Sequence, residues 1–174
     1  MKRLALLTSG GDCPGLNPCI RSVVRTALSG GIEAIGVHRG WRGLIDNDME
    51  PMDARSVAGI VNLGGTVLRS SRCPEFRETA AREQAVANLA KRGIDGLVVI
   101  GGNGSLRGAC ELSKQASLPL IGIPKTIDND VGGTDYALGF DTAVNTAVEA
   151  IDKIRDTATS HERLFLVEVM GRAR

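Results

Sequence analysis

Aromatic residues are scarce in this chain of 174 residues, and long apolar runs are missing from it. Phe, Trp and Tyr make up 3% of the sequence, so its core must be built from Leu, Ile, Val and Ala. No apolar stretch approaches the roughly 20 residues that cross a bilayer, so we expect no membrane partner. The 21 basic and 20 acidic residues nearly balance, which predicts no nucleic-acid partner.

Sequence patterns that are typical of zinc sites or of paired cysteines are also missing. The four cysteines form no C-x-x-C pair, and the two histidines stand far apart and near no cysteine motif. Free thiols in a reducing compartment are the simplest account of these cysteines. We therefore expect a cytoplasmic protein.

Short apolar runs alternate with helical patterns along the chain. The runs are uninterrupted, which is typical of parallel strands covered on both faces. This order predicts a doubly wound α/β fold, a mostly parallel sheet in a three-layer α/β/α arrangement. Strands are expected at 3–7, 33–38, 96–100, 118–123 and 164–169. Helices are expected from Asn17, as N-cap, to Gly30, over 77–91, from Gly104 to before Ser117, and over 141–157.

Two of these helices show an apolar face. Residues of the first recur at helical spacing, as do those of the second. The first face holds Ile20, Val23, Val24, Ala27 and Leu28, and the second holds Ala81, Ala85, Val86, Leu89 and Ala90.

Glycine-rich turns follow several of the expected strands. They begin at Gly10, Gly64, Gly101 and Gly132, and none matches a Walker A loop or G-x-G-x-x-G. Glycines let backbone N–H groups approach a phosphate, but a tight strand-to-helix turn explains any one of them as well. Their shared place at strand carboxyl ends, where α/β proteins bind ligands, favours phosphoryl transfer.

The segment 121–130 joins such a strand end to charged side chains. An apolar run ends at Pro124, and Lys125, Thr126, Asp128 and Asp130 follow. These groups suit a phosphate, a metal ion or a hydroxyl that must lose its proton. Taken alone, the segment is better explained as a polar turn after a buried strand, but the glycine-rich turns with the same placement weaken that reading.

Several segments together closely resemble the 6-phosphofructokinase family along the whole chain. They are Gly10 to Asp12, Ser71 to Phe76, Gly101 to Ser105, Pro124 to Asp130, Gly139 to Ala143 and Glu168 to Arg172. The resemblance implies transfer of a phosphoryl group, with Mg²⁺, from ATP to the 1-hydroxyl of fructose 6-phosphate; some branches use pyrophosphate. It also implies that the chain is the N-terminal half of a longer protein, poorly active alone. Residues 1–138 would form the donor-binding domain and 139–174 the start of the sugar-phosphate domain.

The resemblance also implies residue roles. Asp128 would be the general base, Thr126 would contact the transferred group, and Arg172 would stabilise transition-state charge. The donor site would comprise Gly11, Arg72, Cys73, Gly102, Asn103, Gly104 and Ser105. The sugar-phosphate site would comprise Thr126, Ile127, Asp128, Arg163, Met170, Gly171 and Arg172. Asn103 and Asp130 would organise the metal. Arg163 would reach a neighbouring subunit, which implies a homo-oligomer, a dimer or tetramer, with shared active sites.

Two departures bear on the donor and the metal. Lys125 resembles pyrophosphate users, whereas Gly104 resembles ATP users, because a side chain at 104 would collide with a nucleotide. Steric exclusion decides more sharply than an added attraction, so we expect ATP. Asn103 replaces a residue that is usually acidic in the family, which should weaken direct metal binding.

Three other functions stay open at this point. The first is a pyrophosphate-dependent phosphotransferase on the same scaffold. The second is another small-molecule kinase, such as an NAD kinase, against which segments 124–130 and 170–172 argue. The third is a non-catalytic remnant that still binds a nucleotide or a sugar phosphate.

Overall fold

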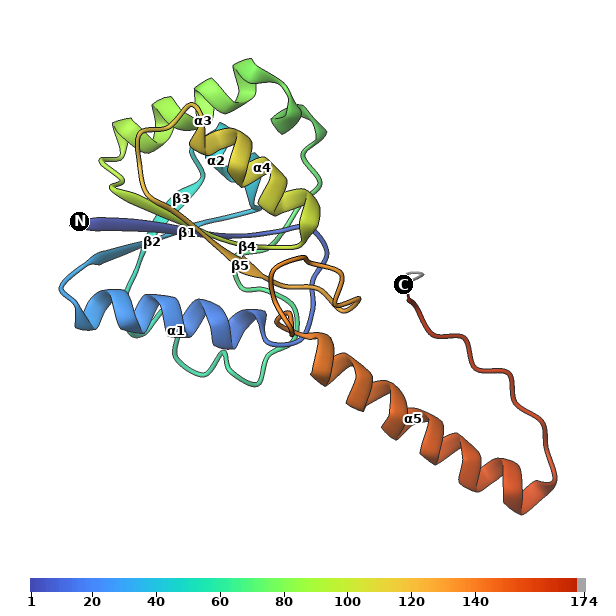
Figure 1. Cartoon of the computed structure of the whole chain (residues 1–174). Helices are drawn as coiled ribbons and strands as arrows, with labels where there is room; N and C mark the ends of the chain where they lie inside the picture. The colour runs from blue at the N-terminus through green and yellow to red at the C-terminus, as the bar shows by residue number, and fades with distance from the viewer. Residues whose placement is uncertain (172–174) are drawn as a thin grey trace.

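A computed structural model describes residues 1–171, in which one sheet lies between two layers of helices (Figure 1). The strands are β1 (Arg3–Ser9), β2 (Glu33–Val37), β3 (Met49–Met52), β4 (Gly96–Gly101) and β5 (Leu120–Pro124). Their order is β3-β2-β1-β4-β5, and only the pairing of β2 with β3 is antiparallel. The predicted fold class is confirmed.

Helices cover both faces of this sheet (Figure 1). One face is covered by α1 (Leu16–Ser29), and the other by α2 (Trp41–Asp46), α3 (Thr79–Lys91) and α4 (Asn103–Ser113), with a 3₁₀ turn, η1 (Pro74–Arg77), before α3. The last helix, α5 (Phe140–His161), extends away from the sheet. Alternate residues of β1 enter two different cores, because side chains along a strand point to opposite faces. Leu6 packs with the α1 layer, whereas Ala5 and Leu7 pack with the layer of α2, α3 and α4.

The sequence analysis missed α2 and β3, which lie between β2 and η1. Both are short, with six and four residues, and Pro51 inside β3 argues against a strand. A proline is tolerated in β3 because this strand lies at the edge of the sheet, where only one of its sides forms backbone hydrogen bonds to a neighbouring strand.

The predicted N-cap of the first helix is wrong. Gly15, in a left-handed conformation with φ 86°, occupies that position. Asn17 is buried instead: its Nδ2 donates to the Leu63 carbonyl at 2.9 Å, and its Oδ1 accepts from the Val67 N–H at 2.8 Å. A side chain read as a cap therefore anchors a distant loop.

The predicted face of the second helix is partly wrong. Ala85 and Leu89 are buried, but Ala90 is exposed, and two polar residues of α3 lie inside. Asn88 Nδ2 donates to the carbonyls of Leu44 and Ile45, each at 2.8 Å, and thereby ties α3 to α2. Hydrogen bonding to a helix end, which periodicity does not reveal, explains the difference.

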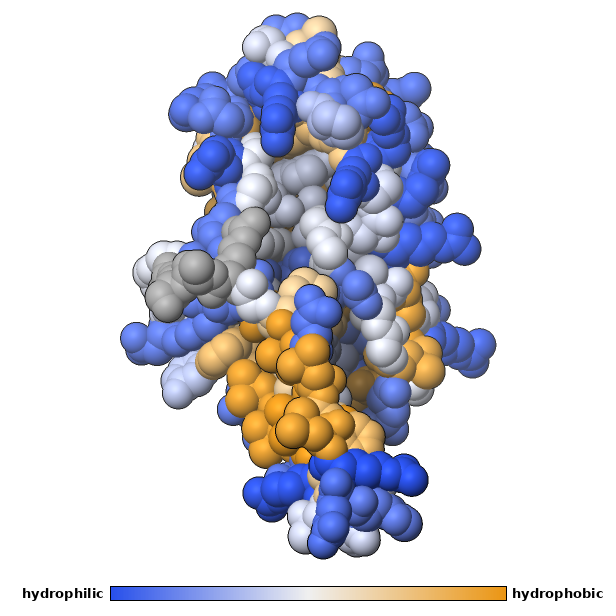
Figure 2. Space-filling model, turned by 90° about the vertical axis from the view of Figure 1, so that its right-hand side faces the viewer, coloured by the Kyte–Doolittle hydropathy of each residue, from blue (hydrophilic) through white to orange (hydrophobic). Residues whose placement is uncertain are grey.

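The strand expected at 164–169 is not formed. The segment is exposed, and no strand lies beside it within residues 1–171, so its backbone has no ladder to join. None of the residues of α5 is buried in the described part of the chain. Val148, Leu164 and Leu166 are among the exposed large apolar residues of this part of the chain. Figure 2 shows apolar side chains gathered on one face of the molecule. The domain boundary expected after residue 138 stays a prediction.

Helices long and apolar enough to span a bilayer are not found among the residues that the structure describes.

Candidate active site

The carboxyl ends of β1, β4 and β5 share one edge of the sheet, because the three strands are parallel neighbours. The turn after β1 starts at Gly10, the turn after β4 leads into α4, and Lys125 directly follows β5. Three segments that are far apart in the sequence thus meet at one edge.

Hydrogen bonds hold these three turns together. Ser9 Oγ and Ser105 Oγ lie 2.9 Å apart in the interior and join β1 to α4. The backbone N–H of Lys125 donates to the Gly101 carbonyl at 3.1 Å. Gly101 must be glycine, since an added Cβ would lie 2.4 Å from that of Ser105.

A loop before η1 closes over the first turn. Ser70 Oγ donates to the Gly10 carbonyl at 2.6 Å, and Thr8 Oγ1 donates to the Arg69 carbonyl at 3.0 Å. These contacts place the next residues of the loop, Arg72 and Cys73, across from the turn after β1.

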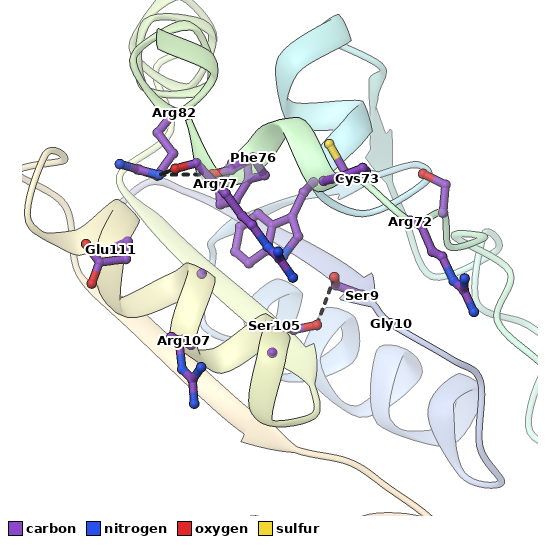
Figure 3. A pocket seen from close by; sticks show the side chains of 15 residues that line it. Ser9, Gly10, Arg72, Cys73, Phe76, Arg77, Arg82, Ser105, Arg107 and Glu111 are labelled. Carbon is purple, nitrogen blue, oxygen red and sulfur yellow. Dashed lines mark hydrogen bonds between the residues drawn. The ribbon is translucent and has the colours of Figure 1, made fainter. Parts of the chain in front are cut away.

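A cavity of about 690 Å³ opens between this loop, η1 and the start of α4 (Figure 3). Four residues predicted for the donor site, Arg72, Cys73, Gly104 and Ser105, line it. Three others, Gly11, Gly102 and Asn103, adjoin it in the chain but are not among its lining residues. The remaining lining residues are Ser9, Gly10, Trp41, Ser71, Pro74, Phe76, Arg77, Arg82, Arg107, Gly108 and Glu111.

An aromatic wall bounds the cavity, and the sequence analysis missed it. The rings of Trp41 and Phe76 stack with centroids 4.1 Å apart and planes 14° from parallel. A Cβ added at Gly108 would touch both rings at 3.5 Å, so α4 packs closely against the wall. No local pattern in the sequence indicated this wall, because 34 residues separate Trp41 from Phe76.

Arginines line the cavity with two different tasks. Arg82 is buried and donates to the carbonyls of Phe76, at 3.1 Å, and Arg77, at 2.6 Å. It therefore braces η1, the element that carries Phe76. The side chains of Arg72 and Arg107 enter the same cavity from different elements (Figure 3), where guanidinium groups suit an anion.

The acidic segment after β5 lies against the turn after β4. Asn103 Nδ2 donates to the Asp130 carboxylate and to the Asp130 carbonyl, each at 3.0 Å. Thr126 Oγ1 donates to the other Asp130 oxygen at 3.3 Å and accepts from the Asp128 N–H at 3.1 Å. The residues predicted for the base and the metal thus belong to one connected group beside the donor turn.

This group fits Mg²⁺ held mainly by other ligands. Within residues 1–171, no three His, Cys, Asp or Glu side chains gather to hold a metal ion. The protein groups that could bind the metal here are the carboxylate of Asp130 and the nearby carboxamide of Asn103. Mg²⁺ commonly takes one or two protein carboxylates and completes its shell with phosphates and waters, so these residues suit it.

Lys125 is buried, with 4% of its surface exposed, and its ammonium donates to the Gly11 carbonyl. Burial lowers the pKa of this ammonium, and the nearby Cys13 and Asp12 oppose that shift. The ammonium group of Lys125 therefore binds the backbone of the first turn. Lys125 is not among the residues that line the cavity.

The predicted sugar-phosphate residues are only partly brought together. Ile127 packs against the core beside Thr126 and Asp128. Arg163, Met170 and Gly171 are exposed and follow α5, which extends away from the sheet (Figure 1). The prediction for Arg172 lies outside the described residues.

A comparison with protein families decides the affiliation. The family model described as Phosphofructokinase matches residues 3–174. The chain belongs to the phosphofructokinase family. Proteins named ATP-dependent 6-phosphofructokinase from Sulfurihydrogenibium sp. (strain YO3AOP1) and Lysinibacillus sphaericus are 60% and 59% identical to it over 172 residues. The matches cover 99% of this chain but 53% and 54% of those relatives.

Solved phosphofructokinase structures share the fold. The Saccharomyces cerevisiae structure matches with a TM-score of 0.89 and 38% identity, over 99% of this chain and 26% of the other. A pyrophosphate-dependent phosphofructokinase from Marinobacter aquaeolei matches with a TM-score of 0.79, over 91% of this chain and 42% of the other. Its 21% identity supports the fold alone.

Proposed function

We propose that the protein acts as a 6-phosphofructokinase, which transfers a phosphoryl group from ATP to the 1-hydroxyl of fructose 6-phosphate. One observation carries the proposal: a cavity lined by two stacked aromatic rings and by arginines lies at the carboxyl edge of the sheet, beside the hydrogen-bonded group of Asn103, Thr126 and Asp130. The names of the bacterial relatives support it.

The shape of the cavity favours ATP over pyrophosphate as the donor. A volume of about 690 Å³ falls in the range of sites for nucleotide-sized ligands. The stacked rings of Trp41 and Phe76 line one side of the cavity and are otherwise buried, with 5% and 4% of their surface exposed. A Cβ added at Gly104 meets no heavy atom of residues 1–171 within 4 Å, so the glycine keeps part of the cavity open.

The acceptor chemistry rests on the segment after β5. In our proposal Asp128 takes the proton of the sugar hydroxyl, which makes the oxygen a nucleophile for the phosphoryl group. Thr126, held by its hydrogen bonds to Asp128 and Asp130, orients this segment. Asp130 and Asn103 would hold Mg²⁺, whose charge would offset that of the phosphates.

The sugar phosphate, the oligomer and the location remain proposals from the resemblance. Arg163, Met170, Gly171 and Arg172 would bind the sugar phosphate in a homo-oligomer with shared sites. The free state of the four cysteines supports a cytoplasmic location.

A donor assay tests the proposal. We would assay the chain alone and as a hybrid, defined here as residues 1–174 joined to the remaining sequence of the Sulfurihydrogenibium relative. The proposal predicts ADP release that depends on fructose 6-phosphate in the hybrid, with the unmodified relative as the active control. Activity with pyrophosphate and none with ATP would contradict the choice of donor.

Asp128→Asn separates an enzyme from a binding module. In an enzyme, this variant should lose turnover and keep its affinity for ATP. A hybrid that binds ATP without turnover, and that Asp128→Asn leaves unchanged, would instead favour the non-catalytic remnant.

A further inference from the structure

A strained residue separates the two aspartates of the acidic segment. Asn129 has a φ of 50°, in the left-handed backbone region that residues other than glycine rarely adopt. Asn tolerates this region better than most residues because its short polar side chain can bond locally. Its neighbours on either side are Asp128 and Asp130, to which the proposed function gives the proton transfer and the metal.

The carboxamide of Asn129 bridges to a second segment. Its Nδ2 donates to the Asp135 carbonyl at 2.9 Å, and its Oδ1 accepts from the Ala137 N–H at 2.9 Å. Both ends of the side chain are therefore used, and the loop 129–137 is closed on itself.

The bridged segment is itself fixed to the end of β5. The N–H of Leu138 donates to the Pro124 carbonyl at 3.0 Å, and the N–H of Thr126 donates to the Leu138 carbonyl at 3.1 Å. Ala137, next to Leu138, is buried. Asn129 thus connects the acidic segment to a backbone pairing that continues the strand.

We propose that Asn129 is a positioning residue, whose left-handed backbone and two side-chain hydrogen bonds set the relative placement of Asp128 and Asp130. The inference rests on the proposed function. Asp130 is also held from the other side by Asn103 and Thr126, so the segment is anchored at both flanks of the proposed base. Asn129 touches no reacting group and acts only through its neighbours.

Two variants remove both side-chain hydrogen bonds and differ in how well the backbone accepts the left-handed conformation. Asn129→Gly accepts the left-handed conformation without strain but lacks both hydrogen bonds. Asn129→Ala lacks the bonds and adds strain. Asn47→Gly is the matched control, since Asn47 is also left-handed, with φ 59°, and bonds through its carboxamide oxygen to Arg92 Nε at 2.8 Å.

The first readout is hydrogen exchange of the Ala137 amide in the 174-residue chain. It should accelerate in both Asn129 variants and stay unchanged in Asn47→Gly. The second is the kinetics of the hybrid. In both Asn129 variants, kcat should fall on the order of 10²-fold, the effect of a small misplacement of reacting groups, whereas the KM for ATP should hold. Because a smaller folded fraction would also lower the apparent kcat and leave the KM for ATP unchanged, kcat is divided by the concentration of ATP-binding sites measured in the same sample.

Three outcomes would count against specific parts of this account. An Ala137 amide that keeps its wild-type exchange in Asn129→Gly would overturn the bridge. Faster exchange with a wild-type kcat would overturn the positioning role. A wild-type hybrid that binds ATP and transfers nothing would refute the proposed function, and exchange at Ala137 would then decide on the bridge by itself.

Discussion

Gly104→Asp should separate donor binding from stability. Gly104 is the second residue of α4 and lines the cavity, and a Cβ built there finds open space in the described structure. A carboxylate about 5 Å from one phosphate charge, at an effective dielectric constant of about 20, is repelled by about 3 kcal/mol. Affinity for ATP should therefore fall on the order of 10²-fold.

The same change should not weaken the fold. Glycine is disfavoured in a helix by up to about 1 kcal/mol relative to Ala, and an acidic residue in the first turn gains about 0.3–1 kcal/mol. The melting temperature of Gly104→Asp should thus equal or exceed that of the wild type. Gly64→Asp is the control, because Gly64 is an exposed loop glycine with equally open space that does not line the cavity.

Calorimetric titration with ATP and thermal unfolding would be measured on all three proteins. Wild-type affinity for ATP in Gly104→Asp would refute the steric and electrostatic argument for the donor site. A loss of affinity that accompanies a lower melting temperature would refute it too, since unfolding would then explain the loss.

Three further changes probe the surroundings of the cavity. The free energy of unfolding of the wild type should rise with pH between the lowered folded pKa of Lys125 and its ordinary value of 10.5, because the unfolded chain keeps a proton there that the folded chain releases. Urea unfolding from about pH 7 to about pH 10 should show this rise in the wild type and not in Lys125→Met. An identical slope in the two proteins would contradict this expectation. Asn17→Asp keeps the acceptor oxygen but turns a carboxylate towards the carbonyl oxygens of residues 63 and 64. Calorimetry should therefore find a free energy of unfolding that is lower by about 1–3 kcal/mol. An unchanged melting temperature would show that these hydrogen bonds of Asn17 are dispensable. Asn103→Asp replaces a donor to Asp130 with a second carboxylate, so ATP binding should need less Mg²⁺, and an unchanged Mg²⁺ titration would argue against a role for residue 103.

Local patterns predicted the elements that position the site. Uninterrupted apolar runs located β1, β2 and β4, because buried parallel strands need apolar residues on both faces. The same kind of run located β5, although its residues are exposed or half-buried at the edge of the sheet. Glycine turns at their ends then indicated where the site lies. The order of the strands is enough to predict that these turns lie at one edge of the sheet, and the βαβ pattern largely fixes that order.

What the sequence did not reveal depends on contacts between distant segments. The cavity wall needs Trp41 and Phe76 to stack, although 34 residues separate them, and no periodicity links the two. Asn17 looked like a cap because its neighbours form a helix start, but its partners are 46 to 50 residues away. The expected strand at 164–169 failed because an apolar run becomes a strand only beside another strand.

Titration of the 174-residue chain with ATP, followed by the fluorescence of Trp41, tests the central claim most directly. Trp41 is the only tryptophan of the chain and lines the cavity, so it reports on what enters there. The account predicts a saturable change in emission with ATP that Gly104→Asp greatly weakens. An emission that does not respond to millimolar ATP, or that responds equally in Gly104→Asp, would contradict it.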